Sequence, residues 1–281
     1  MRIGFVTLGM GARPLDEVLQ MAIAAGCEVM ELNGRATVHQ NLWAPPIDYA
    51  GIKRRIAASG VVPTSLGGYS NFAQPTDEGL AAQVEQLVGY CQIAREMGIP
   101  IVRAFSGDEL EGYTLDQLYP RIVAGFKAVA ERIAGWGITL GIENHGRLMN
   151  NGDHLSSLIH DVHSPLVRIT IDTGNFCWAG HPIETAQRFF EKLAPLAVNV
   201  HVKDGRFING EWTLFPAGRG DLDIAGFLAT LAAAGYKGPI LSEYEGRADF
   251  ALATTESVAY LRGLRDGLGQ AHVLDNRPNI S

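Results

Sequence analysis

Cysteine is scarce in this sequence, which has only Cys27, Cys91 and Cys177 among 281 residues. The three are far apart, odd in number and include no CxxC pair. Such a set provides neither a disulfide framework nor a thiolate metal site. We therefore expect three reduced thiols in a cytoplasmic globular protein.

Long apolar runs and an excess of positive charge are also lacking. No segment approaches the roughly 18 uninterrupted apolar residues of a membrane span, and the start, MRIGFVTLGMG, does not resemble a signal peptide. The 23 Lys and Arg residues are outnumbered by 30 Asp and Glu, for a net charge of −7. A nucleic-acid-binding protein would instead show a basic face. We expect neither a membrane nor a nucleic acid as partner.

What the sequence does contain is a regular alternation of short β-branched runs with longer amphipathic ones. Strands that alternate with helices indicate βαβ units and a parallel sheet. Eight such units without a Gly-x-Gly-x-x-Gly fingerprint favour closure into a (β/α)8 TIM barrel, for which the chain length is suitable. We expect one barrel domain over 1–269 and a C-terminal tail over 270–281. The predicted strands are Ile3–Leu8, Glu28–Leu32, Val61–Leu66, Ile99–Phe105, Ile138–Glu143, Val167–Asp172, Val198–Lys203 and Pro239–Glu243.

Four metal-ligating side chains fall at the carboxyl ends of four successive predicted strands: Glu143, Asp172, His201 and Glu243. Barrel enzymes place their active sites at this end. Alone, each residue has an ordinary explanation, because a carboxylate can cap a helix and a single His is often a core residue. Together, three buried acids would repel one another unless a divalent cation bound them. We predict one divalent ion, with Mn²⁺ preferred and Mg²⁺, Co²⁺ or Zn²⁺ as alternatives. A predicted loop over Glu211–Gly220 lengthens the last interval.

The runs GIENHG, ITIDTGNF, VNVHVKD, PAGRGDLDIAGFL and GYKGPILSEYEG resemble the sugar isomerase/epimerase superfamily of xylose-isomerase-like barrels. That group includes ketose 3-epimerases, inosose isomerases and dehydratases, hydroxypyruvate isomerases and dehydroshikimate dehydratases. The likeness extends from Met1 to about Leu268 and includes Glu31. It implies that Glu143 and Glu243 are catalytic as well as metal-binding, and that Asp172 and His201 complete the ligand set. At Asn175 many members carry a His, whereas an Asn cannot exchange protons near pH 7.

Further polar residues near these strand ends are candidates for substrate binding: His145, Asn175, Lys203 and Arg206. A solvated basic loop explains Lys203 and Arg206 equally well, and His145 can be a loop residue without a role. Asp204 could orient His201 or pair with Lys203. The run Gly218–Asp221 lies near the usual phosphate site of barrels, although an N-capping turn explains it too.

We expect a metal-dependent isomerase or epimerase of a keto-sugar, keto-inositol or related polyol that acts through a metal-stabilised enediolate. The alternative is a metal-dependent lyase that dehydrates an inosose or 3-keto-polyol. The partner is then a small carbohydrate or polyol, and barrels of this type commonly form homo-oligomers. A metal-dependent endonuclease is disfavoured, because it would need extra His ligands and a basic groove.

Overall fold

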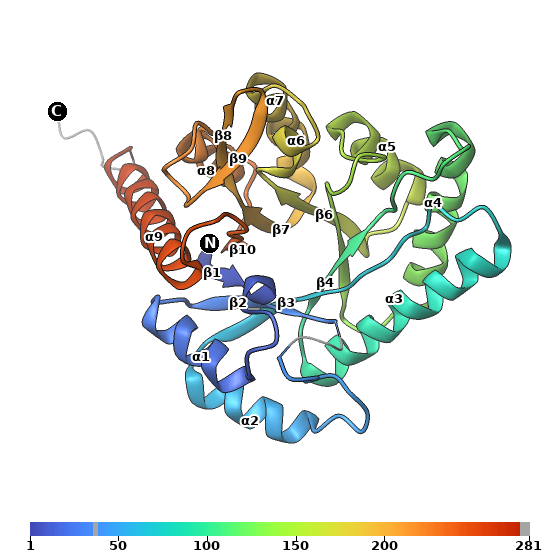
Figure 1. The fold of residues 1–281 in the computed structure, drawn as a ribbon, viewed down its shortest axis with the longest axis horizontal. Coiled ribbons are helices and arrows are strands. Elements are labelled where there is room, and N and C mark those ends of the chain that lie inside the picture. Colours follow the sequence, from blue (N-terminus) through green and yellow to red (C-terminus); the bar gives the residue numbers. More distant parts are fainter. Residues whose placement is uncertain (36–38, 276–281) are drawn as a thin grey trace.

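The computed structural model describes residues 1–35 and 39–275, and its centre is a closed barrel of parallel strands (Figure 1). The order around the barrel is β1-β10-β7-β6-β5-β4-β3-β2. Every predicted strand is present, with ends within two residues of the expected ones. The barrel strands are β1 (Arg2–Val6), β2 (Val29–Asn33), β3 (Val62–Gly67), β4 (Ile101–Phe105), β5 (Thr139–Glu143), β6 (Val167–Asp172), β7 (Ala197–Val202) and β10 (Pro239–Ser242).

Amphipathic helices surround the barrel and bury their apolar faces against it (Figure 1). Gly60 and Gly98 end two of them in the left-handed conformation, with φ of 73° and 72°, which glycine adopts without steric cost. The helices are α1 (Leu15–Ala24), α2 (Tyr49–Ser59), α3 (Asp77–Met97), α4 (Leu115–Arg132), α5 (Gly152–Val162), α6 (Asn175–Trp178), α7 (Ile183–Leu193), α8 (Ile224–Ala233) and α9 (Phe250–Asp275), with 3-10 turns η1 (Thr7–Met10) and η2 (Ala194–Leu196).

The parallel register aligns the strand ends that carry the candidate ligands. Asp172 on β6 is paired with His201 on β7, and His201 is paired with Leu241 on β10. Glu143 is paired with Thr170, two residues before Asp172. Because the strands run in one direction, these side chains reach the same mouth of the barrel.

Two segments differ from the sequence expectation. The predicted loop over Glu211–Gly220 contains a strand, β9 (Glu211–Phe215), which pairs antiparallel with β8 (Asp204–Ile208). An Asn209-Gly210 turn with positive φ at both residues joins them, as is typical of tight hairpins. Helix α9 continues to Asp275, into the predicted tail, whereas 276–281 lie outside the described residues. The division into a barrel over 1–269 and a tail stays a prediction. In the part of the chain that is described, no helix combines the length and apolarity of a membrane span.

Candidate metal centre

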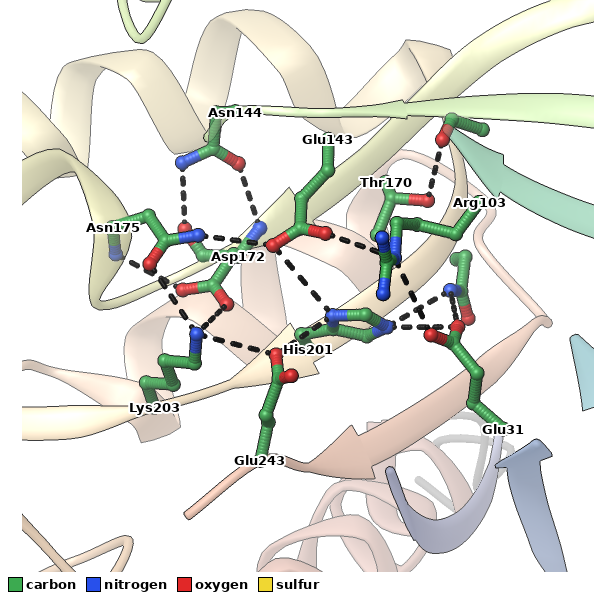
Figure 2. Close-up of polar contacts among 12 residues, drawn as sticks. Glu31, Arg103, Glu143, Asn144, Thr170, Asp172, Asn175, His201, Lys203 and Glu243 are labelled. Carbon is green, nitrogen blue, oxygen red and sulfur yellow. Dashed lines mark hydrogen bonds and ion pairs between the residues drawn. The ribbon is translucent and has the colours of Figure 1, made fainter. Parts of the chain in front are cut away.

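The four predicted ligands converge in the barrel mouth. Glu143, Asp172, His201 and Glu243 are all buried and each offers one ligand atom, and these atoms lie within 4.8 Å of one another. Glu143 and Asp172 are the last residues of β5 and β6, His201 lies on β7, and Glu243 directly follows β10. Figure 2 shows Glu143 and Glu243 entering the cluster from opposite sides of His201.

The residues of the cluster are suited to a divalent cation, because several of their buried side-chain atoms form no hydrogen bond. Asp172 Oδ2, His201 Nδ1 and Glu243 Oε2 are buried and form no hydrogen bond, although both carboxylate oxygens form ion pairs with Lys203. The His201 ring lies with Nδ1 3.0 Å from Glu243 Oε2 and 3.9 Å from Glu143 Oε1. Buried polar atoms without hydrogen bonds are costly. Two carboxylate oxygens and one imidazole nitrogen gathered in this way form a donor set suited to Mn²⁺, Mg²⁺, Co²⁺ or Zn²⁺.

The charges of the cluster lead to the same conclusion. Four buried carboxylates belong to it, from the three acidic ligands and Glu31, and two buried cations, Arg103 and Lys203, face them. Burial disfavours the imidazolium, but Glu31 and Glu243 raise the pKa of His201 well above its usual value, and burial raises the pKa of Asp172 to about 8. Protons thus offset the excess negative charge of the cluster, and a divalent ion would take their place.

Hydrogen bonds from neighbouring residues fix the ligand orientations. Glu31 Oε2 lies 3.0 Å from His201 Nε2 and also accepts hydrogen bonds from Ser65 Oγ at 2.7 Å and Asn199 Nδ2 at 3.0 Å. With its Nε2–H donated to Glu31, a His201 ring that releases its second proton to a bound ion would present the Nδ1 lone pair to the cluster. Asp172 Oδ1 accepts hydrogen bonds from the backbone N–H groups of Gly174 and Asn175, so that Oδ2, which is ion-paired with Lys203, is the oxygen left for an ion.

The electrostatics of the cluster are dominated by Lys203. Its Nζ lies 3.2 Å from Asp172 Oδ2, 3.4 Å from Glu243 Oε2 and 2.6 Å from Glu245 Oε2. Burial disfavours the ammonium, but these carboxylates raise the pKa of Lys203 well above its usual value. Burial likewise disfavours the Glu243 carboxylate, yet Lys203 and His201 hold its pKa well below the usual range. Both groups are therefore charged at neutral pH.

A cavity of about 340 Å³ opens above the cluster. It exposes polar groups together with the apolar side chains of Trp178 and Leu214, as expected of a site for a small polar molecule. The side chain of His145 stacks on Phe105, with ring centroids 4.1 Å apart. The cavity is lined by His145, Gly174, Asn175, Trp178, Lys203, Leu214 and Glu245.

Comparison with known proteins agrees with this architecture. A family model described as the xylose isomerase-like TIM barrel matches residues 19–264. The chain belongs to the xylose isomerase-like TIM barrel family. The resemblance and fold inferred from the sequence are thereby confirmed.

Three similar proteins share between 16% and 24% of their residues with this chain. A 3-dehydroshikimate dehydratase of Pseudomonas putida is 24% identical over 248 residues, covering 82% of this chain and 36% of that protein. The chain thus spans about a third of the length of this relative. The structure of L-ribulose 3-epimerase superposes with a TM-score of 0.80 at 20% identity, over 100% of this chain and 99% of that one. A barrel of this family from Mycobacterium smegmatis in complex with magnesium gives 0.76 at 16% identity, over 94% and 96%.

The structure brings three of the four predicted substrate-binding residues together. His145, Asn175 and Lys203 line the cavity, whereas Arg206 lies on the β8–β9 hairpin. Arg206 donates a hydrogen bond to the Arg219 carbonyl and lies 3.7 Å from Asp221, and it is not among the lining residues.

The Asp204 side chain binds backbone groups of the following loop and does not orient His201. Its carboxylate accepts hydrogen bonds from the backbone N–H groups of Gly205, Gly218, Gly220 and Leu222. Donors that a barrel phosphate site would use are therefore occupied by a side chain of the protein.

Sequence reasoning missed the residues that support this family site from within the barrel. Arg103, Asn144 and Asn199 are buried polar residues, and none of them was a candidate. The side-chain amide of Asn144 holds the backbone of Asp172 at both ends: Oδ1 accepts from the Asp172 N–H at 2.7 Å, and Nδ2 donates to the Asp172 carbonyl at 2.9 Å. A charge inside the apolar run Ile101–Phe105 was the signal that could have identified Arg103, since a charged residue is rarely buried unless it is paired.

Proposed function

We propose that the protein is a divalent-metal-dependent isomerase or epimerase of a keto-sugar, keto-inositol or related polyol. The observation that carries this proposal is the convergence of Glu143, Asp172, His201 and Glu243. Asn175 and Lys203 contact these ligands and also line the neighbouring cavity. The four converging residues would hold the ion, with Mn²⁺ preferred. When bound, the ion supplies Lewis-acid polarisation of a substrate carbonyl, which makes the neighbouring C–H more acidic.

The two glutamates supply the proton chemistry. Glu143 and Glu243 come from strands that are not adjacent in the barrel and approach the centre from different sides (Figure 2). One carboxylate removes the proton next to the carbonyl, and the other returns a proton to the opposite face or to the adjacent carbon. The first outcome is epimerisation and the second is isomerisation. Asn175 Nδ2, 2.9 Å from Glu143 Oε1, keeps that carboxylate in place without exchanging protons itself.

Cavity residues would bind and orient the substrate. The Lys203 ammonium and the Asn175 amide are suited to sugar hydroxyl and carbonyl oxygens. The apolar side chains of Trp178 and Leu214 offer contacts for the C–H face of a sugar. Cytoplasmic location and assembly into a homo-oligomer stay predictions.

A dehydratase is the second candidate, supported by the similarity to the Pseudomonas putida enzyme. The first step would be the same removal of a proton next to the carbonyl. The product would then form by departure of a β-hydroxyl as water, which needs a proton donor beside the leaving oxygen. His145 and Lys203, which both line the cavity, are the groups placed for this step.

The nature of the product distinguishes the two reactions. The Mn²⁺-loaded protein is incubated in D2O with a panel of ketoses and inososes, and the products are analysed by mass spectrometry and NMR. An isomerase or epimerase introduces solvent deuterium at carbon and keeps the molecular formula, whereas a dehydratase removes water. Glu143→Gln and Glu243→Gln should abolish turnover, while Glu131→Gln, at an exposed glutamate on α4, is the matched control. Deuterium incorporation that persists in the Glu143→Gln/Glu243→Gln double variant would contradict the proposal.

A further inference from the structure

A buried arginine lies directly beneath the metal centre. Arg103 on β4 is only 2% exposed, and it is the largest fully buried side chain among the described residues. Its guanidinium carbon lies 4.4 Å from the ring centroid of Phe105 and 4.8 Å from that of Tyr69. Removing a guanidinium from water costs several kcal/mol. Its partners must offset this cost.

Those partners are two carboxylates from different strands. Arg103 Nε lies 3.1 Å from Glu143 Oε2 on β5 and 3.4 Å from Glu31 Oε1 on β2, as Figure 2 shows. A third contact fixes the guanidinium to the backbone, since Nη1 donates to the Gly68 carbonyl at 3.0 Å. One rigid planar cation therefore joins β2, β4 and β5 around two acids.

Each of these acids determines the orientation of a candidate metal ligand. Glu143 is itself a ligand, and Arg103 and Asn175 engage its two oxygens from different directions. Glu31 has no atom in the ligand group. Its Oε2 accepts from His201 Nε2, which leaves His201 Nδ1 as the nitrogen that faces the cluster. Outer partners of this kind keep a ligating imidazole in one tautomer and one ring orientation.

We propose that Arg103 is a positioning residue of the metal centre, which aligns Glu143 directly and His201 through Glu31. This inference rests on the proposed metal-dependent function. It makes Arg103 a determinant of metal affinity although it does not line the substrate cavity.

A simpler role, charge compensation alone, leads to the opposite expectation. If Arg103 only offset negative charge, its removal would make the cluster more negative and strengthen binding of a divalent cation. If Arg103 positions the ligands, its removal weakens binding despite the increase in negative charge. Loss of an outer partner typically lowers metal affinity by about 10- to 100-fold.

The test is Mn²⁺ binding by the metal-stripped full-length protein, measured by isothermal titration calorimetry and by the EPR signal of free Mn²⁺. Positioning predicts a loss of about 10- to 100-fold for both Arg103→Met and Arg103→Lys, because Lys keeps the charge but lacks the planar fork. Charge compensation predicts tighter binding for Met and unchanged binding for Lys. Arg168→Met is the matched control, since Arg168 is an exposed arginine on another barrel strand, β6.

A second variant keeps the test decisive if Arg103→Met fails to fold, which circular dichroism would detect. Glu31→Gln preserves size but removes the carboxylate that connects Arg103 to His201, and it should weaken Mn²⁺ binding to a similar extent. The Arg103→Met/Glu31→Gln double variant should lose less than the product of the two single losses, because both act on His201. Wild-type binding retained or strengthened in Arg103→Lys and Glu31→Gln overturns this inference alone. Absence of Mn²⁺ binding by the wild type overturns the proposed function as well.

Discussion

Glu243 and Glu245 form a matched pair with which the metal centre can be tested through stability. Both carboxylates contact the Lys203 ammonium, at 3.4 and 2.6 Å, and they are two residues apart in sequence. Glu243 belongs to the ligand group, whereas Glu245 is 41% exposed and does not. Replacing either glutamate with Gln removes one negative charge from the surroundings of the Lys203 ammonium. Only Glu243→Gln should remove the stabilisation that Mn²⁺ provides.

The size of this stabilisation follows from mass action. An ion present at about 100 times its Kd stabilises the folded state by about 2.7 kcal/mol. The entropy of unfolding is about 2.1 cal/mol/K per residue, or about 590 cal/mol/K for 281 residues. The melting temperature should therefore rise by about 4–5 °C. If Glu243→Gln weakens binding about 100-fold, which is the upper value for an outer partner, the rise falls below about 1 °C at the same Mn²⁺ concentration.

Differential scanning calorimetry with EDTA or with Mn²⁺ measures both shifts. Glu245→Gln should keep most of the wild-type increase even though it loses the shorter contact with Lys203. The reasoning would be refuted by equal loss of the Mn²⁺ shift in the two variants, or by an unchanged shift in Glu243→Gln.

Three further predictions concern stability and thiol reactivity. Asp204→Ala should lower the free energy of unfolding by about 3 kcal/mol, because it leaves four backbone N–H groups without their acceptor; urea unfolding should show a change within about 0.5 kcal/mol for the partly exposed Asp221→Ala, and similar losses would contradict this role of Asp204. Gly141→Ala should cost about 1–3 kcal/mol, because its Cβ would lie 2.4 Å from Thr170 Oγ1. Gly89→Ala, in open space on α3, should instead stabilise the protein by about 0.5–1 kcal/mol, and the same sign for both would refute the steric account. Burial raises the pKa of each cysteine thiol to about 12, so the native protein should not react with Ellman's reagent at pH 8, and three thiols should react after denaturation. Because the thiol pKa of the folded protein exceeds the unfolded value of about 9, the stability gained by keeping these thiols protonated is lost as the pH rises above about 9. Rapid reaction of the native protein with the reagent would contradict the burial of the thiols.

The barrel and its ligand group could be predicted because both depend on a periodic signal. Each βα unit begins with an apolar β-branched run, and the end of that run marks the barrel mouth. Glu143 and Asp172 are terminal residues of such runs, so their placement follows once the strands are recognised. The register that pairs Asp172 with His201 then brings the two side chains together.

The hairpin over Asp204–Phe215 was not predicted, since only Glu211–Gly220 was assigned, as a loop, although the hairpin signal is local. Asn209-Gly210 between two short runs is a strong hairpin signal. Its charged and polar side chains, Asp204, Arg206, Glu211 and Thr213, all lie on one face, and Phe207, Trp212 and Leu214 lie on the other. Turn chemistry and alternation were therefore both present in the sequence.

The polar residues inside the barrel are a different case, because their partners are distant in the sequence. Asn199 contacts Glu31 across 168 positions, and Arg103 joins residues of β2 and β5. No local pattern specifies such a pairing. What the sequence did contain was the presence of Arg103 within a buried strand, and a buried charge requires a partner.

This arrangement divides the site into two layers with different constraints. The inner layer, Arg103 and Glu31, contacts the ligands but not the cavity, so changes there should alter metal affinity for any substrate. The outer layer, including His145, Asn175 and Lys203, lines the cavity, and under the proposed function it would determine which hydroxyls are held and which protons can move. Epimerisation, isomerisation and dehydration share the first proton removal and differ only in what happens above the ion. Asn175 and Lys203 also contact the ligands, so His145 is the position of this layer at which a change of residue should alter the reaction while the metal centre stays the same.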